Sequence, residues 1–187
     1  MPRITPLSYE TAPPAAREAH DDHVRRHARI TNMKRTLLHS LPAFHALMEW
    51  YPLRDTVQPF LGERLTTLYA HAISSETDCL ICSTFFRRIL IDGGEDPDRL
   101  ALDPREAAVV EFGRRLAVSP FRVPDAVYQR VAAHFDPGQM VALAAFGALM
   151  VATNVFNNAV EVELDQYLLP YRREGQPEGA AASGERA

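Results

Sequence analysis

Two cysteines placed three residues apart are the groups in this chain best suited to chemistry. Cys79 and Cys82 are the only cysteines among its 187 residues, and they follow the polar run from Ser74 to Asp78. If a helix begins near Asp78, both sulfurs lie on one face of its first turn, where backbone N–H groups and the helix dipole favour a thiolate. A disulfide can also close at this spacing. We therefore expect a redox-active pair; the alternative is two small apolar side chains buried at a helix start.

Two other uses of the pair fit the sequence less well. A structural zinc site needs four ligands, and the sequence offers neither a second cysteine pair nor a histidine pair near the first. A secreted disulfide framework needs more cysteines, and the N-terminal residues lack the apolar segment of a signal peptide. We therefore expect a cytoplasmic protein that uses neither a metal nor a cofactor.

Composition predicts one helical domain over residues 1–173, followed by a disordered tail over 174–187. Hydrophobic residues make up 47% of the chain, which is ordinary for a globular protein, while the tail is rich in Gly, Ala, Ser and Glu. The net charge is −4 and the basic residues are scattered, so we expect no nucleic-acid partner. The sequence contains no run of about 18 apolar residues, so we expect no membrane span.

Apolar residues recur at helical spacing, whereas strand-like alternation is scarce, which predicts an all-α fold of about seven to eight helices. The expected helices cover 13–28, 41–51, 63–73, the cysteine helix up to Ile91, 104–118, 124–134, 137–160 and a short segment at 164–168. Pro52 and Pro59 are expected to bracket a break, and glycine after Asp92 to form a left-handed cap. The apolar excess over 137–160 predicts a homo-oligomer.

With these elements placed, the chain resembles the carboxymuconolactone decarboxylase and alkyl hydroperoxidase D-like superfamily. The resemblance is carried by Arg3 to Pro14, Ser74 to Cys82, Leu102 to Glu106, Val123 to Asp125 and Ala152 to Ala159. It extends over residues 3 to 170 and implies an all-α fold that assembles as a homo-oligomer.

The resemblance also implies a mechanism. In the thiol-active branch of that superfamily the second cysteine, here Cys82, attacks a peroxide, and the first, here Cys79, resolves it as a disulfide. A glutamate and a histidine relay the proton, but Thr67 and Phe86 occupy those two positions in this chain. General acid–base help is worth about 10²–10⁴-fold, so its loss slows turnover without forbidding thiol oxidation.

Other residues near the pair are candidates for the missing relay. Glu76 and His71 are the candidate catalytic groups, although a helix-start carboxylate and a core histidine are their simpler interpretations. Arg87 or Arg88 is a candidate to stabilise a thiolate, unless both lie on a solvated face.

Two polar clusters stand apart from the relay candidates. His20, His23 and His27 share one helical stripe that favours an exposed polar face over a metal site. Asn154, Asn157 and Asn158 are candidates to line a pocket or to satisfy backbone and interface hydrogen bonds.

Three functions remain open at this point. The first is a thiol-dependent oxidoreductase, a weak peroxidase or disulfide reductase, with a small-molecule substrate such as a hydroperoxide and an unknown thiol as electron donor. The second is a non-catalytic oligomeric binding protein with a degraded site, which Thr67 and Phe86 favour. The third is a thiol-independent decarboxylase of the lactone type, for which the sequence shows no acid–base set.

Overall fold

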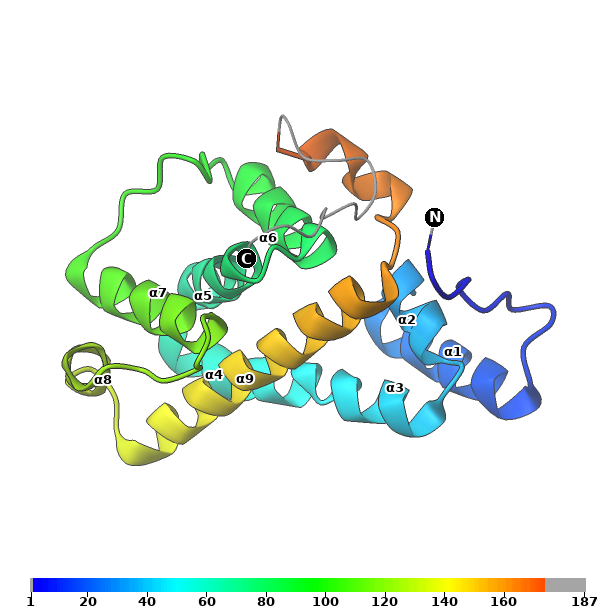
Figure 1. The fold of residues 1–187 in the computed structure, drawn as a ribbon, viewed down its shortest axis with the longest axis horizontal. Helices are drawn as coiled ribbons and strands as arrows, with labels where there is room; N and C mark the ends of the chain where they lie inside the picture. The colour runs from blue at the N-terminus through cyan, green and yellow to red at the C-terminus, as the bar shows by residue number, and fades with distance from the viewer. Residues whose placement is uncertain (1, 174–187) are drawn as a thin grey trace.

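A computed structural model describes residues 2–173 and confirms the all-α fold for that range (Figure 1). Its helices are α1 (Pro14–His27), α2 (Asn32–Leu37), α3 (Leu41–Met48), α4 (Trp50–Leu61), α5 (Glu63–Glu76), α6 (Leu80–Asp92), α7 (Pro104–Ala117), α8 (Asp125–Ala132), α9 (Pro137–Val160) and a 3₁₀ helix, η1 (Gln166–Tyr171). The predicted tail at 174–187 lies outside the described residues.

Helix α9 crosses the molecule diagonally and ties its parts together (Figure 1). It begins with a capping box. The Asp136 carboxylate accepts a hydrogen bond from the Gln139 backbone N–H, and the Gln139 side-chain oxygen accepts one from the Asp136 backbone N–H. Its inner face packs against α4, α5 and α7. A second, smaller core lies among α1, α2 and α3, and Met33 and Phe156 contact both cores. Met33 on α2 and Phe156 on α9 therefore join the two cores.

The centre of the core leaves no spare volume around Tyr69. This side chain is fully buried, and its hydroxyl donates to the Leu143 carbonyl oxygen at 3.0 Å. A Cβ added at Gly147 would collide with the Tyr69 hydroxyl, and one added at Gly113 would lie 2.8 Å from its ring. Gly113 and Gly147 therefore let α7 and α9 approach α5 closely, and this close packing fixes the position of α9 along α5.

The expected break between Pro52 and Pro59 is wrong, because both prolines lie inside α4. Pro52 stands in the first turn, where the backbone N–H has no partner within the helix in any case. Pro59 stands in the last turn, flanked by the buried Val57 and Leu61. The chain breaks instead at Glu49, between α3 and α4.

Other boundaries differ from expectation by a few residues. The cysteine helix α6 begins at Leu80, with Cys79 as its N-cap, and the left-handed glycine after it is Gly94, at φ 83°. The short helix α2 was not expected, because six residues give too little periodicity to detect. The last segment forms a 3₁₀ helix that includes Pro170, instead of an α-helix ending before it.

Helix α9 is the one described helix long and apolar enough to span a membrane by length and composition. Its buried residues include Leu143, Phe146 and Met150, which pack in the core. The face turned away from the core exposes a row of small apolar residues: Val141, Ala145, Ala148, Ala152 and Val155. A core helix with one uncovered face accounts for this pattern better than a membrane span does.

We predict that this exposed row of α9 is buried in a homo-oligomer, because Val141 and Val155 remain 70% and 54% exposed in the single chain. Sedimentation at micromolar concentration should give a dimer or a larger assembly, and the double change Val141→Glu with Val155→Glu should shift it towards monomer. Glutamates placed instead at Tyr128 and Val118, which are also exposed, serve as the control. A wild-type species of 20.9 kDa at all concentrations would contradict the prediction.

Candidate functional site

The cysteine pair stands just after a tight reversal between α5 and α6. Asp78 adopts φ 49°, a left-handed conformation that aspartate tolerates better than most residues. The Cys79 N–H then returns to the Ser74 carbonyl oxygen at 3.1 Å. The reversal is held from α9, since the Asn154 amide donates to the Thr77 hydroxyl and the Asn158 amide donates to the Thr77 carbonyl, both at 2.8 Å.

One amide on α9 contacts both sulfurs. The Nδ2 group of Asn157 lies 3.3 Å from the Cys82 sulfur and 3.6 Å from the Cys79 sulfur, and it donates to both. Cys79 is fully buried, whereas Cys82 keeps 8% of its surface exposed. Both are free thiols. The pair is therefore buried, polarised by one donor, and open to ligands only on the Cys82 side.

The two thiols differ in acidity. The pKa of Cys79 is lowered because the Cys82 thiol donates a hydrogen bond to its sulfur, with further help from the backbone N–H groups of Cys82 and Ile81 and from Asn157. The same Cys82–Cys79 bond, together with burial, raises the pKa of Cys82. The first negative charge of the pair therefore rests on Cys79, at the start of α6, and Cys82 carries the shared proton.

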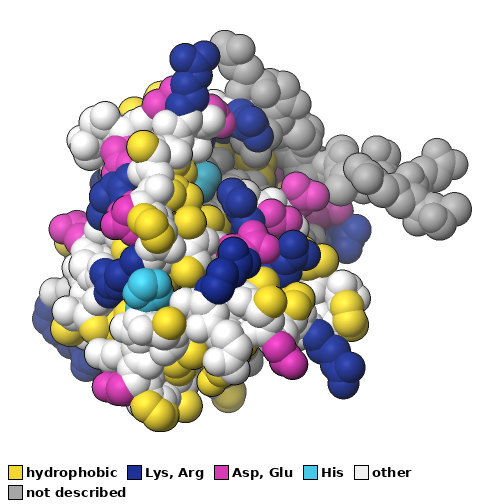
Figure 2. Space-filling view, turned by 90° about the vertical axis from the view of Figure 1, so that its left-hand side faces the viewer, with side chains coloured by type: hydrophobic (Ala, Val, Ile, Leu, Met, Phe, Trp, Pro, Cys, Tyr) yellow, Lys and Arg dark blue, Asp and Glu magenta, His cyan; other side chains and the backbone are white. Residues whose placement is uncertain are grey.

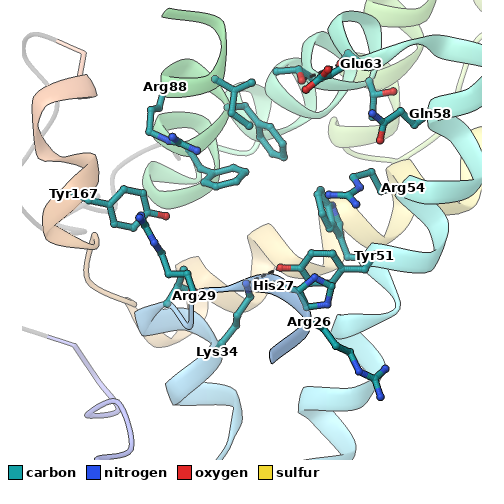
Figure 3. Close-up of a pocket in the computed structure, with 17 residues that line it drawn as sticks. Arg26, His27, Arg29, Lys34, Tyr51, Arg54, Gln58, Glu63, Arg88 and Tyr167 are labelled. Atoms are coloured by element: carbon teal, nitrogen blue, oxygen red, sulfur yellow. Dashed lines mark hydrogen bonds between the residues drawn. The ribbon is translucent and has the colours of Figure 1, made fainter. Parts of the chain in front are cut away.

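Two adjoining pockets lie in front of Cys82. The thiol pocket has a volume of about 100 Å³ and is mostly apolar; its walls include Met33, Leu47, Met48, Ile81, Cys82 and Met150. The cationic pocket has a volume of about 550 Å³; its walls include Arg26, Arg29, Lys34, Arg54, Arg88 and Glu63 (Figure 3). The two pockets adjoin, because both are lined by residues that include Lys34, Trp50, Phe85 and Tyr167.

Positive charge dominates the cationic pocket although the chain as a whole has a net charge of −4. Five cationic side chains face a single carboxylate, that of Glu63. His27 adds no charge at neutral pH, because burial lowers its pKa and it stacks on Tyr51 with ring centroids 3.6 Å apart. On the face drawn in Figure 2, by contrast, basic and acidic side chains are interspersed. The lining of the pocket is therefore richer in cations than that face, although aspartates outside the lining pair with three of the five.

The two positions of the missing relay face this site. Thr67 lines the cationic pocket, and Phe86 lines both pockets. The Thr67 hydroxyl donates to the Glu63 carbonyl oxygen at 3.0 Å, so it is engaged within its own helix. Phe86 is buried and packs against Trp50 and Phe85. The backbone thus places both positions in the site, while neither side chain can exchange a proton at neutral pH.

Glu76 and His71, the two relay candidates proposed from sequence, line neither pocket. Glu76 is exposed at the end of α5, with a carboxylate oxygen 3.7 Å from Arg114. Burial, together with the nearby Arg87, lowers the pKa of His71 to about 4. The structure therefore brings together Cys79 and Cys82 but leaves these two candidates on other faces of α5.

The remaining candidates have identifiable partners. Arg87 forms an ion pair with Asp98 at 2.8 Å, and Arg88 forms one with Asp92 at 3.2 Å while also lining the cationic pocket. Neither arginine is hydrogen-bonded to a sulfur among the described residues.

The histidine stripe of α1 is divided between solvent and the pocket wall. His20 contacts Asp21, while His23 is buried against Phe44 and Tyr51, and burial lowers its pKa to about 3. Within residues 2–173 no group of three or more potential ligands gathers into a metal site.

Sequence reasoning missed the pocket and the contact of Asn157 with the sulfurs. The asparagines of α9 were recognised as pocket or hydrogen-bonding candidates, but their link to the cysteines spans 75 residues and needs the three-dimensional fold. Lys34 is the single lysine of the chain, but no residue from 30 to 38 is aromatic, so its place among the aromatic residues of the pocket also needs the fold.

Comparison with solved structures places the chain among proteins of the alkylhydroperoxidase AhpD-like fold. The debrominase Bmp8, in its apo form, matches with a TM-score of 0.74 and 16% sequence identity, over 90% of this chain and 95% of that chain. A cysteine-to-alanine variant of Bmp8 bound to 2,3,4-tribromopyrrole matches with the same TM-score, identity and share of this chain, and over 94% of that chain.

An AhpD-core, peroxidase-related protein from Ralstonia eutropha JMP134, itself uncharacterized, matches with a TM-score of 0.69 and 17% identity, over 89% of this chain and 94% of that chain. No protein-family model and no curated protein matches the sequence. At these identities the likeness shows the fold alone.

We predict that Asn157→Ala raises the pH needed to ionise the pair. A hydrogen bond to a charged group is worth roughly 1.5–3 kcal/mol, so losing part of it should move the midpoint up by about one pH unit. The measurement is the pH dependence of alkylation by iodoacetamide, read by mass spectrometry on protein shown to be folded by circular dichroism. Asn158→Ala, which removes an amide that does not touch sulfur, is the matched control. Identical midpoints for the two variants would contradict the assigned role of Asn157.

Proposed function

We propose that the protein is a thiol-dependent oxidoreductase in which Cys82 attacks a small-molecule substrate and Cys79 resolves the product as a disulfide. The observation that carries the proposal is the layered geometry of the pair. Cys82 lines the thiol pocket and Cys79 does not. Only Cys82 can meet a ligand, and only Cys79 can then reach Cys82 from behind.

The acidity of the pair adds a cost to this division of roles. Because the pKa of Cys79 is lowered and that of Cys82 is raised, Cys82 becomes a thiolate only by an uphill transfer of its proton to Cys79, which is the adjacent base. With a hydroperoxide, the Cys82 thiolate takes one oxygen to become a sulfenic acid, and the alkoxide leaves with a proton from pocket water. Cys79 then attacks the Cys82 sulfur, hydroxide leaves as water, and an external thiol reduces the disulfide.

A second candidate reaction is favoured by the size of the site. A cationic pocket of about 550 Å³, with a thiol pocket walled by Trp50 and Phe85, exceeds what a peroxide needs and suits a ring. Reductive debromination of an electron-rich ring uses the same two thiols: a carbon–bromine bond becomes carbon–hydrogen, bromide leaves, and the cysteines become a disulfide. Bromide released per disulfide formed distinguishes this reaction from peroxide reduction.

Thiol cycling is the direct prediction of the proposal. One equivalent of peroxide should remove two titratable thiols per chain, and dithiothreitol should restore both. In Cys79→Ser the oxidised Cys82 has no resolving partner, so dimedone should trap it as a sulfenic acid; Cys82→Ser should react much more slowly. The readout is intact-protein mass spectrometry. If both wild-type thiols stay free, the redox proposal fails and the non-catalytic binding function is favoured.

The missing relay gives a gain-of-function prediction. Because Thr67 and Phe86 both face the site, the double change Thr67→Glu with Phe86→His should raise peroxide turnover, by up to the 10²–10⁴-fold that general acid–base help supplies. Losing the buried Phe86 destabilises the fold by a few kcal/mol, so activity is compared on folded protein. Thr67→Gln with Phe86→His, which keeps the shape of the new side chain but removes its carboxylate, is the control. A folded double variant with wild-type turnover would mean that the site no longer serves peroxide chemistry.

A further inference from the structure

Lys34 is the feature of the pocket that the thiol chemistry leaves unexplained. It is the single lysine of the chain, it is half-buried, and it lines both the cationic and the thiol pocket. Its ammonium donates to the Tyr51 hydroxyl at 2.8 Å (Figure 3). Among the described residues no carboxylate lies within 4.0 Å of it. A partly buried ammonium with a neutral partner is unfavourable unless something anionic joins it.

The charged neighbours of Lys34 do not neutralise it. Asp165 attracts it from beyond ion-pair distance, but that carboxylate is half-buried and already accepts from the Asn32 backbone at 2.9 Å. His23 and His27 face it from α1, and burial keeps both neutral. As a result, burial lowers the pKa of Lys34 to about 8.

A second cation lies at the same pocket without an ion-pair partner in the described chain. The Arg29 guanidinium carbon lies 4.0 Å from the centre of the Tyr167 ring, which holds it over that ring. The other pocket arginines differ, because Arg26, Arg54 and Arg88 are paired with Asp22, Asp55 and Asp92 at 3.0, 2.6 and 3.2 Å. Lys34 and Arg29 therefore remain as the two donors available to a ligand anion.

The apolar end of the site defines the rest of the ligand. The thiol pocket holds about 100 Å³, and Phe85, Trp50 and Met150 supply flat or deformable walls next to Cys82. A space of this size suits one ring. The distribution of charge then orients the ligand, with the apolar body towards Cys82 and the anionic group towards Lys34.

We propose that the two pockets bind an aromatic carboxylate, with its ring in the thiol pocket beside Cys82 and its carboxylate on Lys34 and Arg29. A singly charged planar group matches one ammonium and one guanidinium fork. The carboxylates of Glu63 and Asp165 in the pocket walls oppose a ligand of higher charge. The proposal deepens the proposed function, because it names the substrate class of the same site, but binding itself does not require the thiols to react.

The test compares 4-methylbenzoate with 4-methylbenzamide, which share shape and differ in charge. Binding is followed by the fluorescence of Trp50, the single tryptophan, which lines both pockets, and is repeated by titration calorimetry. The benzoate should bind at least about tenfold more tightly than the amide. The reduced wild-type protein and the Cys79→Ser with Cys82→Ser variant should agree, so a failure of thiol cycling leaves this measurement intact.

Variants locate the anion. Lys34→Met should reduce the preference for benzoate to within about threefold, since the ion pair is removed and the apolar contacts remain. Lys34→Arg should keep the preference. Arg130→Met removes an exposed charge on α8, far from the pocket walls, and should leave the preference unchanged.

Proton uptake gives a second readout that a merely structural lysine would not move. At pH 8.5 part of Lys34 is deprotonated in the free protein, and a bound carboxylate favours the ammonium, so binding should take up a fraction of a proton. Calorimetry in two buffers of different ionisation enthalpy measures that fraction. Lys34→Arg should show none at this pH.

Three results would overturn the proposal. The first is equal affinity for the benzoate and the amide in the wild-type protein. The second is a preference for benzoate that survives in Lys34→Met. The third is competition by inorganic phosphate as strong as that of 4-methylbenzoate, which would reveal an anion site without an aromatic requirement.

Discussion

The amide of Asn157, placed between two buried sulfurs, is the interaction on which the candidate site depends. A buried thiolate is unfavourable without donors, and this amide lies within 3.6 Å of both sulfur atoms. It can do so only if α9 is held at the right position along α5. The hydrogen bond from the Tyr69 hydroxyl on α5 to the Leu143 carbonyl oxygen on α9 fixes that position within the core. Asn154 and Asn158 hold the α5–α6 reversal from the same helix. The site therefore forms only when the long-range packing of the fold is complete.

The pocket beside the cysteine pair is lined by cationic side chains and lacks the glutamate and histidine that would relay a proton to a peroxide. Thr67 and Phe86 cannot move a proton at neutral pH, yet their positions still face the site. Ionisable groups line the pocket from other positions, among them His27 on α1, Lys34 on α2 and Arg54 on α4. A site with fixed positive charge and no relay is better suited to holding an anion than to delivering protons rapidly. Selectivity for a ligand would then matter more than speed on a peroxide.

Much of the fold could be predicted from local signals. The capping boxes at Asp103 and Asp136 are set by residues within three positions, so α7 and α9 begin where the sequence indicates. Pro52 misled because a proline is tolerated in the first turn of a helix, and the sequence alone does not show which turn it occupies. Pro59 lies inside α4, where the burial of Val57 and Leu61 on either side of it keeps the segment helical. Cys79 and Cys82 were recognisable by spacing, whereas the contact of Asn157 with them and the gathering of cations around Lys34 depend on packing between distant elements.

The charge of a ligand in the pocket affects how readily Cys82 ionises. An anionic ligand beside Cys82 would disfavour a thiolate there, because like charges in a buried site repel strongly. That penalty falls if the ligand's charge is neutralised by Lys34 before Cys82 gives up its proton to Cys79. Because the pKa of Cys82 is raised, an oxidant that enters the pocket without engaging Lys34 meets a protonated Cys82 thiol. The positive charge at Lys34 and the high pKa of Cys82 would together make the cysteine pair react with a ligand bound at Lys34 in preference to an oxidant that does not bind there.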